Sequence, residues 1–482
     1  MKCFVIITMW LLLVFGLGPQ FNVDKMLSSF SLLVSLFLLS GNKNIKRYFI
    51  LPLLILPLVY FTTGMIYGRL NIGILVSFFE TNVRESLEFL SVIPMLFVLL
   101  NILLLIVIII YVSYVEFKFN KKIILVGVVL FLISPVGDFY KRIFINTTLA
   151  FNENKKFTES LLIQPSWEII SNKSNYDDYV LIIGESMRKD YMSAYGYALN
   201  TTPFLKKTNG FFLDGYLSAA PNTTTSLPRT LSLKYGDVSN TIITLANQSG
   251  LETTWISNQG FVGSFDTAIS MIAQRSKHKF FLKLGSYDSM NVNDSAILPI
   301  FTKELGKKTK KHRLFILHLM GSHPDFCERI RKDIYHLDNK QLSCYLSSYK
   351  GTDNLIKNVI NRLKKRKRSY SLIYFSDHGL NDTGTKEKSQ LHVGNAYLSN
   401  YSIPFIRLSS DDTKKVTVKN KVSAFHFISI FSNWIGVKTK QAPDFDMTKK
   451  EKDVYIFNFG NLIEVKSLLP DPSITIPDPV SI

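Results

Sequence analysis

The sequence is poor in cysteine and in acidic residues, and its second part lacks long apolar runs. Three cysteines among 482 residues stand in no zinc-finger spacing, and no base-reading motif is present, so we expect no nucleic-acid partner. The 37 acidic residues are outnumbered by 56 basic ones, which gives a formal charge of +19. For a membrane-tethered chain, this excess favours anionic lipid or anionic glycan as a partner.

The cysteines bear on the compartment. Cys3 lies at the start of the first apolar run, where we expect it to be inert, whereas Cys327 and Cys344 lie seventeen positions apart in the globular part. In an oxidising compartment these two could form a disulfide. The alternative is two unrelated free thiols, and the residues alone leave that choice open.

Almost every long apolar run precedes Asp138, and five runs approach the length of about 20 residues that a helix needs to cross a bilayer. The first run resembles a signal peptide, but no small-residue cleavage site follows it, so we expect a retained anchor. We therefore predict an N-terminal membrane domain of five transmembrane helices, at approximately Cys3–Gly18, Met26–Leu39, Tyr48–Tyr67, Leu90–Val115 and Lys122–Val136.

The charges between these runs predict their orientation. Lysine and arginine gather at 43–47 and at 118–122, which places those two connections in the cytoplasm by the positive-inside rule. Acidic residues dominate the connection at 68–88, which suits the outside. Everything after Tyr140 then lies outside, which in a bacterium means a multi-pass inner-membrane protein with its globular part in the periplasm.

We therefore expect a membrane domain at 1–139, a linker at 140–176 and a globular domain at 177–482. The apolar residues between Leu161 and Ile170 include Trp167, which favours membrane surfaces. They suit an amphipathic helix lying on the membrane, or equally a packed linker.

The globular part alternates short apolar runs with helical stretches such as Ile242–Ser249, before Gly250, and Asp353–Lys365. Near-continuous apolar strands separated by helices predict an α/β/α sandwich with a mostly parallel central sheet. The predicted strands are Tyr179–Ile183, Thr253–Ile256, Leu314–Leu319, Ser371–Phe375, Ile403–Leu408 and Val454–Phe457.

The densest charge cluster is Arg362–Arg368, where the helix Asp353–Lys365 ends. Cations are favourable at a helix C-terminus through the helix dipole, so a solvated helix end explains the cluster. Contact with anionic lipid headgroups is the alternative.

Three predicted strands end in residues with metal or phosphate chemistry: Glu185, the segment His318–His323, and Asp377-His378. The carboxyl ends of the strands in such a sheet are where ligand groups collect. Carboxylate and imidazole together suit zinc, and buried carboxylates are costly unless paired or metal-bound. These strand ends therefore predict a shared cation, although an Asp-His pair alone could be structural.

The segment Ala220–Thr230 has several Thr and Ser hydroxyls where a loop enters a helix. Helix capping would explain this composition. The functional interpretation is a hydroxyl nucleophile that a metal ion activates.

In combination these motifs resemble the phosphoethanolamine transferases of Gram-negative inner membranes, members of the alkaline phosphatase and sulfatase superfamily. The likeness spans most of the chain, including the five-helix anchor. The motifs that carry it are Gly184–Arg188, Tyr195–Tyr197, Thr201–Pro203, Thr223–Pro228, His318–His323, Tyr349 with Asp353-Asn354, Ser376–Gly379 and Glu80–Asn82.

The resemblance implies a role for each site residue. Glu185, Thr223, Asp377 and His378 would be zinc ligands, with Thr223 as the nucleophile and its neighbours Thr224 and Thr225 as alternatives. His323 and His392 would be catalytic residues lining the phosphate or acceptor side, where a second metal could also bind. The cysteines Cys327 and Cys344 flank the place where many relatives have a disulfide.

By the same resemblance, the expected reaction is zinc-dependent transfer of phosphoethanolamine from phosphatidylethanolamine through a covalent phospho-threonine. The acceptor would be lipid A, a lipooligosaccharide core or another surface glycan, and we expect a monomer. One alternative is a glycerol-phosphate transferase of the lipoteichoic-acid-synthase type. Another is a membrane-bound sulfatase or phosphatase, against which Arg229 stands one place early for the sulfatase signature Cys/Ser-x-Pro-x-Arg. A receptor or scaffold without activity is a third.

Overall fold

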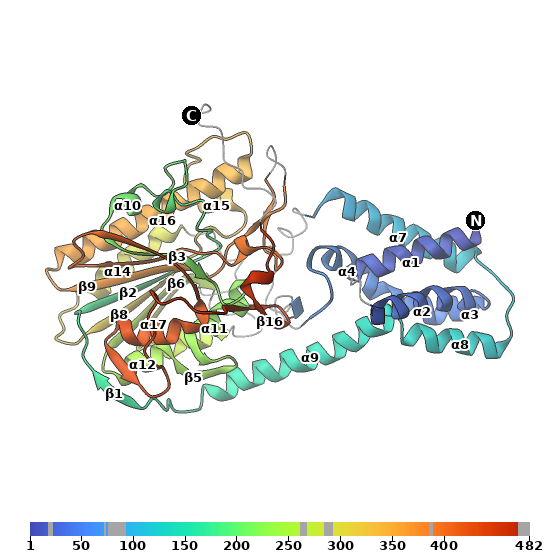
Figure 1. Ribbon diagram of the computed structural model, residues 1–482, viewed down its shortest axis with the longest axis horizontal. Helices are drawn as coiled ribbons and strands as arrows, with labels where there is room; N and C mark the ends of the chain where they lie inside the picture. The colour runs from blue at the N-terminus through green and yellow to red at the C-terminus, as the bar shows by residue number, and fades with distance from the viewer. Residues whose placement is uncertain are drawn as a thin grey trace. The chain divides into compact units, whose positions relative to one another are not determined.

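The computed structural model of the chain (Figure 1) describes residues 1–17, 23–71, 74–75, 93–260, 268–283, 293–384 and 389–470. The Glu80–Asn82 motif and the acidic residues of the third predicted connection, Glu80, Glu85 and Glu88, lie outside the described residues.

An eight-stranded sheet forms the centre of the globular part. Five of its seven strand pairs are parallel, and only β12 runs against both of its neighbours, so the sheet is mixed and mostly parallel. Its strands in spatial order are β13 (Lys415–Ser423), β3 (Gly210–Leu217), β12 (Phe405–Ser409), β9 (Tyr370–Ser376), β2 (Asp178–Gly184), β8 (Arg313–His318), β6 (Glu252–Gly260) and β7 (His278–Lys283).

The central strands are apolar on both sides because both faces of the sheet are covered. All seven residues of β2 are buried. Tyr179, Leu181 and Ile183 enter one hydrophobic core, and the alternate residues Val180 and Ile182 enter the other.

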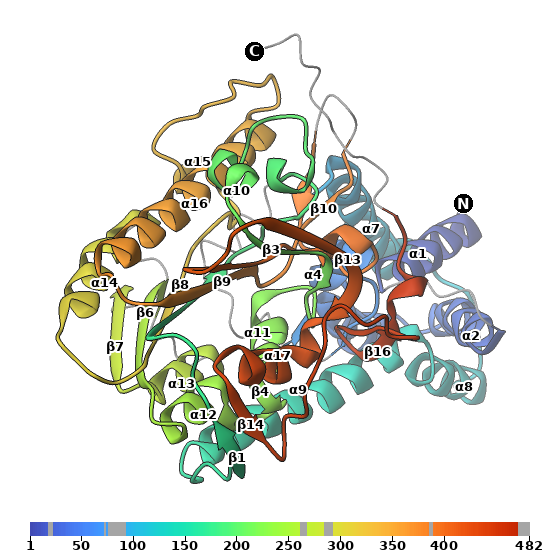
Figure 2. The same ribbon diagram turned by 60° about the vertical axis from the view of Figure 1, so that its left-hand side comes forward.

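The helices form two layers, one on each face of the sheet, as Figure 2 shows, and this α/β/α arrangement is the predicted one. One layer contains α10 (Pro203–Lys207), α14 (Ile297–Gly306), α15 (Phe326–Arg329) and α16 (Lys340–Lys365). The other contains α11 (Thr223–Leu231), α12 (Ile242–Gln248), α13 (Ala268–Gln274) and α17 (Phe427–Trp434).

The remaining strands form two-stranded sheets, and the predicted strand Val454–Phe457 belongs to one of these rather than to the central sheet. The pairs are β1 (Ile169–Asn172) with β14 (Val437–Thr439), β4 (Ser232–Lys234) with β5 (Asp237–Thr241), β10 (Asn381–Asp382) with β11 (Leu391–His392), and β15 (Tyr455–Asn458) with β16 (Asn461–Glu464). Short 3₁₀ turns lie at Ser193–Tyr195, Asp294–Ala296, Leu398–Asn400, Ala424–His426 and Val465–Ser467.

The segment between Leu161 and Ile170 is not helical, so the prediction of an amphipathic helix there is wrong. Trp167 is 4% exposed, and its Nε1 donates to Thr244 Oγ1 at 3.0 Å. Ile169 begins β1. The tryptophan is buried because its indole has both a hydrophobic core and a hydrogen-bond acceptor available inside the globular unit, so the segment is a packed linker.

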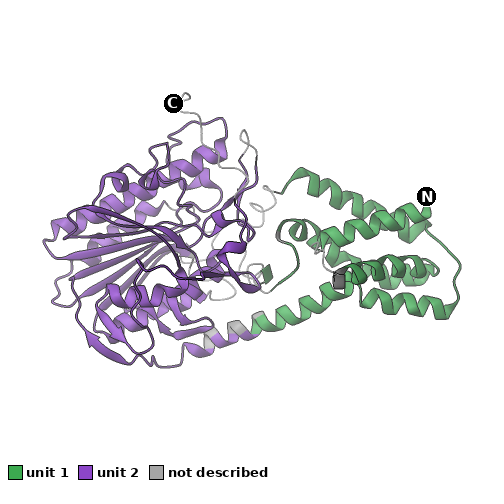
Figure 3. Ribbon diagram, in the orientation of Figure 1, with its two compact units in different colours: residues 1–78, 89–151 green, residues 79–88, 152–482 purple. Residues whose placement is uncertain are grey.

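The chain divides into two compact units, coloured separately in Figure 3: Met1–Phe78 with Phe89–Phe151, and Phe79–Glu88 with Asn152–Ile482. The first is helical and has its own apolar core. Its helices are α1 (Lys2–Gly16), α2 (Val23–Leu39), α3 (Lys43–Ile45), a π-helical turn (Lys46–Ile50), α4 (Leu51–Tyr67), α7 (Met95–Tyr114), α8 (Lys121–Leu132) and the start of α9 (Pro135–Ser160).

Within the described residues, two helical stretches are long and apolar enough to cross a membrane, Lys43–Ile66 and Met95–Tyr114. A third span results if Lys121–Leu132 and Pro135–Leu149, which meet at a bend of 48°, act together. The first two predicted spans are apolar helices of shorter length, at Lys2–Gly16 and Met26–Leu39. The described residues therefore contain two to three candidate spans by this measure, where five were predicted.

Candidate active site

Glu185 and Asp377 lie side by side because each directly follows one of two adjacent parallel strands. The register of β2 and β9 sets Gly184 opposite Ser376, and the Asp377 amide donates to the Gly184 carbonyl at 3.1 Å. Both carboxylates are buried, at 1% exposure each. The carboxyl ends of two central strands therefore bring together two acids that are far apart in sequence.

Thr223 is the first residue of α11, and the side chain of Asn222 caps this helix by accepting from the Thr225 amide. Ser226, one turn along the helix, donates its hydroxyl to the Asp377 carbonyl at 2.7 Å. This bond fixes the start of α11 against the end of β9. The cap and the helical periodicity together point the Thr223 hydroxyl at the two carboxylates, while Ser226 faces the backbone.

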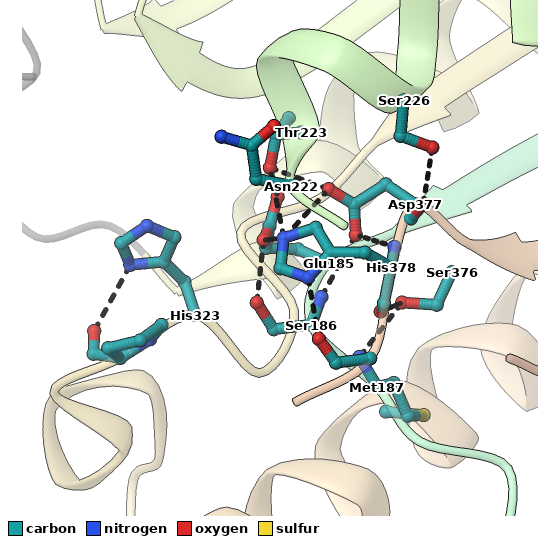
Figure 4. A network of polar contacts seen from close by, with 12 residues as sticks. Glu185, Ser186, Met187, Asn222, Thr223, Ser226, His323, Ser376, Asp377 and His378 are labelled. Atoms are coloured by element: carbon teal, nitrogen blue, oxygen red, sulfur yellow. Dashed lines mark hydrogen bonds and ion pairs between the residues drawn. The ribbon is translucent and has the colours of Figure 1, made fainter. Parts of the chain in front are cut away.

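The Thr223 hydroxyl lies among three polar atoms of the trio, as the close view in Figure 4 shows. Its Oγ1 is 2.9 Å from Glu185 Oε2, 2.6 Å from Asp377 Oδ2 and 3.4 Å from His378 Nε2. A hydroxyl has a single proton and can donate only one of these bonds. These potential ligand atoms can therefore stay this close only with further bound protons or with a cation between them.

The histidine of the trio directs its second ring nitrogen at the same point. His378 Nδ1 is 2.7 Å from the Gly379 carbonyl, so this nitrogen carries a proton and donates it. Nε2 faces the carboxylates, 3.2 Å from Glu185 Oε1 and 3.5 Å from Asp377 Oδ2, and it is the nitrogen that a metal ion could bind in place of a proton. Metal-bound histidines are oriented in this way, by a hydrogen bond from the nitrogen that does not bind the metal.

In the part of the chain that the structure describes, Glu185, Asp377 and His378 are the only group of three or more acid, cysteine or histidine side chains whose ligand atoms all lie within 4.8 Å of one another. Two carboxylates, an imidazole and a hydroxyl make up a donor set that suits zinc. The residues present therefore fit a metal ion.

Charge in the trio is strongly perturbed. Burial opposes the charge of Glu185, but the hydrogen bond and charge of His378 hold its pKa below the usual range. Burial and the charge of Glu185 raise the pKa of Asp377. Burial acts against the charge of His378, yet Asp377 and Glu185 raise its pKa to about 9. Asp377 and His378 therefore hold their protons tightly, because the buried acids favour positive charge beside them. A divalent cation would supply that charge.

A tight turn after β8 packs against the backbone of Glu185. The Ser322 amide donates to the Glu185 carbonyl at 2.9 Å. Gly321 has a φ of +50°, and a Cβ at this position would lie 2.7 Å from the Glu185 nitrogen, so only glycine fits. The half-buried Asp294 accepts from the Met320 and Gly321 amides at 2.8 and 2.9 Å and so holds the turn in place.

The two predicted catalytic histidines lie outside the trio's cluster of ligand atoms. His323 stands to one side of the trio in Figure 4, with its Nδ1 3.1 Å from the Pro324 carbonyl, and burial lowers its pKa to about 4. The charge of Glu185 acts on this ring, so it belongs to the same electrostatic environment. His392 ends β11, opposite Asn381, and its Nδ1 is 3.1 Å from the Gln390 carbonyl.

The structure distinguishes the three neighbouring threonines. Thr224 Oγ1 lies 3.4 Å from Asn222 Oδ1, and Thr225 Oγ1 also bonds to Asn222. Only Thr223 has hydrogen bonds to Glu185 and Asp377 among the three. Sequence spacing could not separate them, because the direction of each hydroxyl depends on where α11 begins.

Three residues that support the site were not predicted. Asn222 has a local signal, since asparagine before a helix start is a favoured cap. Asn400 has none: it accepts from the Gly394 amide and donates to the Pro221 carbonyl, and its own carbonyl accepts from Gly379. Asp294, which holds the turn after β8, was hidden for the same reason, because its partners are distant in sequence.

Cys327 and Cys344 form a disulfide that joins α15 to α16. The predicted pairing is therefore confirmed, and Cys3 is the free cysteine.

The family model for sulfatases matches residues 177–437 of this chain. Among curated proteins, the phosphoethanolamine transferase OpgE of Escherichia coli (strain K12) is 31% identical over 435 residues, which cover 83% of this chain and 82% of that protein.

Two solved structures share the fold. The integral membrane lipooligosaccharide phosphoethanolamine transferase A from Neisseria meningitidis matches with a TM-score of 0.61 and 16% identity, over 91% of this chain and 97% of that one. The C-terminal periplasmic domain of EcEptC from Escherichia coli, crystallised in complex with Zn, matches with a TM-score of 0.57 and 21% identity. That match covers 65% of this chain and 99% of the domain.

Proposed function

The chain belongs to the phosphoethanolamine transferases of the sulfatase superfamily, and on that premise we propose that it takes phosphoethanolamine from phosphatidylethanolamine and passes it to lipid A, a lipooligosaccharide core or another surface glycan. The observation that carries the proposal is the position of the Thr223 hydroxyl, within hydrogen-bond distance of both Glu185 and Asp377 at the carboxyl ends of β2 and β9.

Zinc is the metal that we propose for this site. Glu185, Asp377 and His378 would hold it, and the Thr223 oxygen would be the fourth ligand. The periplasmic domain of a relative with the same fold was crystallised with Zn, which supports this choice. When bound, the ion would lower the pKa of the Thr223 hydroxyl and offset negative charge that builds on the phosphoryl oxygens.

In the first step, Thr223 Oγ1 attacks the phosphorus of the donor lipid. A new oxygen–phosphorus bond forms, the bond from phosphorus to the diacylglycerol oxygen breaks, and diacylglycerol leaves with a proton. In the second step, an acceptor hydroxyl or phosphate attacks the same phosphorus and Thr223 regains its hydroxyl. The intermediate is therefore a phosphoethanolamine ester of Thr223.

His323 and His392 would line the phosphate or acceptor side. Burial keeps the pKa of His323 near 4, so its ring is neutral at physiological pH. A neutral imidazole can donate one hydrogen bond to a phosphoryl oxygen or use its free nitrogen as a ligand. A second metal at these two histidines remains part of the proposal.

The membrane unit has a physical role in this reaction. We propose that the chain crosses a bacterial inner membrane five times with its N-terminus inside, so that the globular unit, as a monomer, lies in the periplasm. The Cys327–Cys344 disulfide fits that oxidising compartment. A tethered enzyme meets a membrane-bound donor at high effective concentration.

The sulfatase alternative has little structural support. Ser226, which would occupy the modified position of the sulfatase signature, donates to the Asp377 carbonyl instead of facing the trio. The Arg229 guanidinium stacks between Tyr235 and Phe457, at 3.6 and 3.7 Å from their ring centres. Neither side chain is placed to act on a sulfate ester.

The nucleophile can be tested on the full chain in nanodiscs that contain headgroup-labelled phosphatidylethanolamine. We expect acid quenching to leave label on the peptide that contains Thr223, with release of diacylglycerol. Thr223→Ala should lower donor cleavage by at least about 10³-fold, since loss of a nucleophile removes the covalent step. Metal content should stay near that of the wild type, because the two acids and the histidine remain.

Thr224→Ala is the matched control, because it removes a neighbouring hydroxyl that faces Asn222 Oδ1, at 3.4 Å. Its activity should stay within about tenfold of the wild type. Full labelling of Thr223→Ala would show that another residue is the nucleophile. Cleavage of phosphatidylglycerol in preference to phosphatidylethanolamine would favour the glycerol-phosphate alternative.

A further inference from the structure

Two basic runs that are far apart in sequence lie next to each other in the globular unit. One follows α14 and contains Lys307, Lys308, Lys310 and Lys311; the other is Arg362–Arg368 at the end of α16. Arg368 joins them, because its Nη1 and Nη2 donate to the carbonyls of Thr309 and Lys311 at 2.8 and 3.2 Å. We call the two runs together the basic surface.

Six of the seven lysines of the basic surface are exposed and have no acidic partner, while Lys307 pairs with Glu304. Among the described residues, none of these six forms an ion pair: Lys308, Lys310, Lys311, Lys364, Lys365 and Lys367. The arginines have structural roles instead, as Arg368 pairs with Asp177 and Asp178. A solvated helix end accounts for the second run alone, but it does not explain why a second group of lysines is held beside it.

A cavity of about 150 Å³ opens in the basic surface, lined by Lys307, Lys308 and Thr309 and by Arg313. That volume is about five times the share of one water in the liquid, which leaves room for a phosphate-sized group. The Arg313 side chain is 4% exposed, and its Nη2 is buried with no hydrogen-bond partner among the residues that the structure describes. A buried guanidinium N–H without an acceptor indicates a position for an anion.

Two acids also line the cavity, and each has a basic side chain beside it. Glu304 Oε2 lies 2.5 Å from Lys307 Nζ, and Glu252 Oε1 lies 3.1 Å from His278 Nε2. Arg313 is paired with Asp178 through its Nε, at 2.7 Å, so the positive charge that has no acid beside it among the described residues includes that of the six exposed lysines, of which Lys308 lines the cavity.

The basic surface and the active site lie at opposite ends of the central strands. Arg313 begins β8, and His318 ends it, at the carboxyl ends of the strands where Glu185 and Asp377 are placed. Six residues of strand span about 20 Å, so one ligand group cannot occupy both places. Figure 2 shows α14 and α16 on the same face of the sheet.

We propose that the basic surface and its cavity form a second binding site, for a polyanionic glycan with phosphate groups. The cavity would take one phosphate on Arg313 and Lys308, and the exposed lysines would hold the rest of the chain by charge. This inference rests on the proposed function, since a glycan acceptor held here would stay near the active site at raised local concentration.

A glycan fits better than a lipid surface. The donor lipid must reach the carboxyl ends of the strands, where Thr223 lies. A membrane bound at the opposite ends of the strands would leave Thr223 facing away from that membrane. A cavity with a fixed guanidinium also suits a discrete phosphate better than a diffuse layer of headgroups.

The test uses the full chain in nanodiscs of zwitterionic lipid, with fluorescent dextran sulfate as the probe and neutral dextran as its control. We expect dextran sulfate alone to bind, and more weakly as salt rises. Replacement of the six exposed lysines named above by glutamine should weaken binding at least tenfold. Cleavage of phosphatidylethanolamine should be unchanged, which separates this proposal from the proposed function.

The matched control removes the same charge elsewhere in the globular unit, by glutamine at Lys414, Lys419, Lys421, Lys449, Lys450 and Lys452, all exposed. It should bind dextran sulfate within twofold of the wild type. Equal losses in the two variants would overturn the proposal in favour of general charge attraction. Selective loss of binding to phosphatidylglycerol vesicles, with dextran sulfate binding intact, would assign the surface to lipid.

A second pair of variants tests the cavity. Inorganic phosphate should displace dextran sulfate from the wild type and from Lys367→Glu, which lies outside the cavity. Lys308→Glu places a negative charge in the cavity lining, so the phosphate concentration for half-displacement should rise at least fivefold. The same half-displacement value in both variants would show that the cavity is not part of the site.

Discussion

The Thr223 hydroxyl differs from its neighbours only in its surroundings. Thr223, Thr224 and Thr225 have the same side chain, and each could be a helix cap or a nucleophile. What separates them is that Oγ1 of Thr223 lies between two buried carboxylates, one of which has a raised pKa. A hydroxyl becomes a nucleophile through the groups that surround it rather than through its own chemistry.

At the residue scale, His318 predicts how stability changes with pH. Burial lowers its pKa to about 4, whereas an unfolded histidine titrates near 6.5. Between these values the unfolded chain binds a proton that the folded chain does not, so stability falls as pH drops from about 6.5 to 4, by up to about 3 kcal/mol. The thermal unfolding midpoint of metal-saturated chain in detergent, measured from pH 7 to pH 4, checks this.

His318→Asn should make that pH dependence shallower, because the replacement does not titrate. His336→Asn is the control: His336 is exposed, and asparagine tolerates its φ of +49°. The control should follow the wild type at every pH. If His318→Asn also followed the wild type, burial of His318 would not be a source of acid sensitivity.

At the element scale, the register between β2 and β9 brings the two acids together, and the turn after β8 holds them there. Gly321 allows this turn to approach Glu185 because it has no side chain. Asp294 accepts hydrogen bonds from two amides of the turn, although it is distant from the turn in sequence. The geometry of the proposed metal ligands therefore depends on residues that contribute no ligand atom themselves.

Gly321→Ala should disturb the site through the backbone. The new Cβ would meet the Glu185 nitrogen and carbonyl oxygen at 2.7 and 2.9 Å, in a left-handed conformation that alanine disfavours. We expect a loss of about 1–3 kcal/mol in stability and a clear loss of bound metal. Thermal unfolding and metal analysis of the purified variant measure the two effects.

Gly351→Ala is the control for that substitution. Gly351 lies inside α16 with open space around it, so alanine should be neutral or stabilising by up to about 1 kcal/mol. Normal metal content in Gly321→Ala would mean that the turn is not needed to hold Glu185.

At the scale of the whole molecule, the two units have different proposed roles. The globular unit contains all of the proposed metal ligands, and the helical unit contains the candidate membrane spans. A tether contributes only when the donor is itself confined to the membrane, because it replaces a search in solution by one at a surface.

Removal of residues 1–151 should therefore affect two donors differently. Cleavage of phosphatidylethanolamine in vesicles should fall by about 10²-fold or more, since the effective concentration of donor is lost. Cleavage of a short-chain, water-soluble analogue should stay within about tenfold of the full chain. Kinetics on both donors, with circular dichroism to verify folding, provide the measurement, and equal losses on both would contradict a purely tethering role.

Much of the fold was predictable because its causes are local. The apolar runs that became β2, β8 and β9 are continuous since both faces of those strands are buried. Three strands of the central sheet were missed: β3 contains glycine and aspartate, β7 has its apolar residues flanked by lysines, and the edge strand β13 alternates lysine with apolar residues. Lysine on an edge strand discourages pairing with other chains, and it also hides the strand from an apolar pattern.

The sequence by itself determined which chemistry was available: an acid or an acid-histidine pair directly after an apolar strand, a cluster of hydroxyls at a helix start, and an apolar first part. Residue type and periodicity are written into neighbouring positions. Only the tertiary structure decided which threonine faces the acids, that Cys327 pairs with Cys344, that Trp167 is buried, and that two basic runs share one surface. Those facts depend on tertiary contacts between residues 17 to 154 positions apart, which leave no trace in any short stretch of sequence.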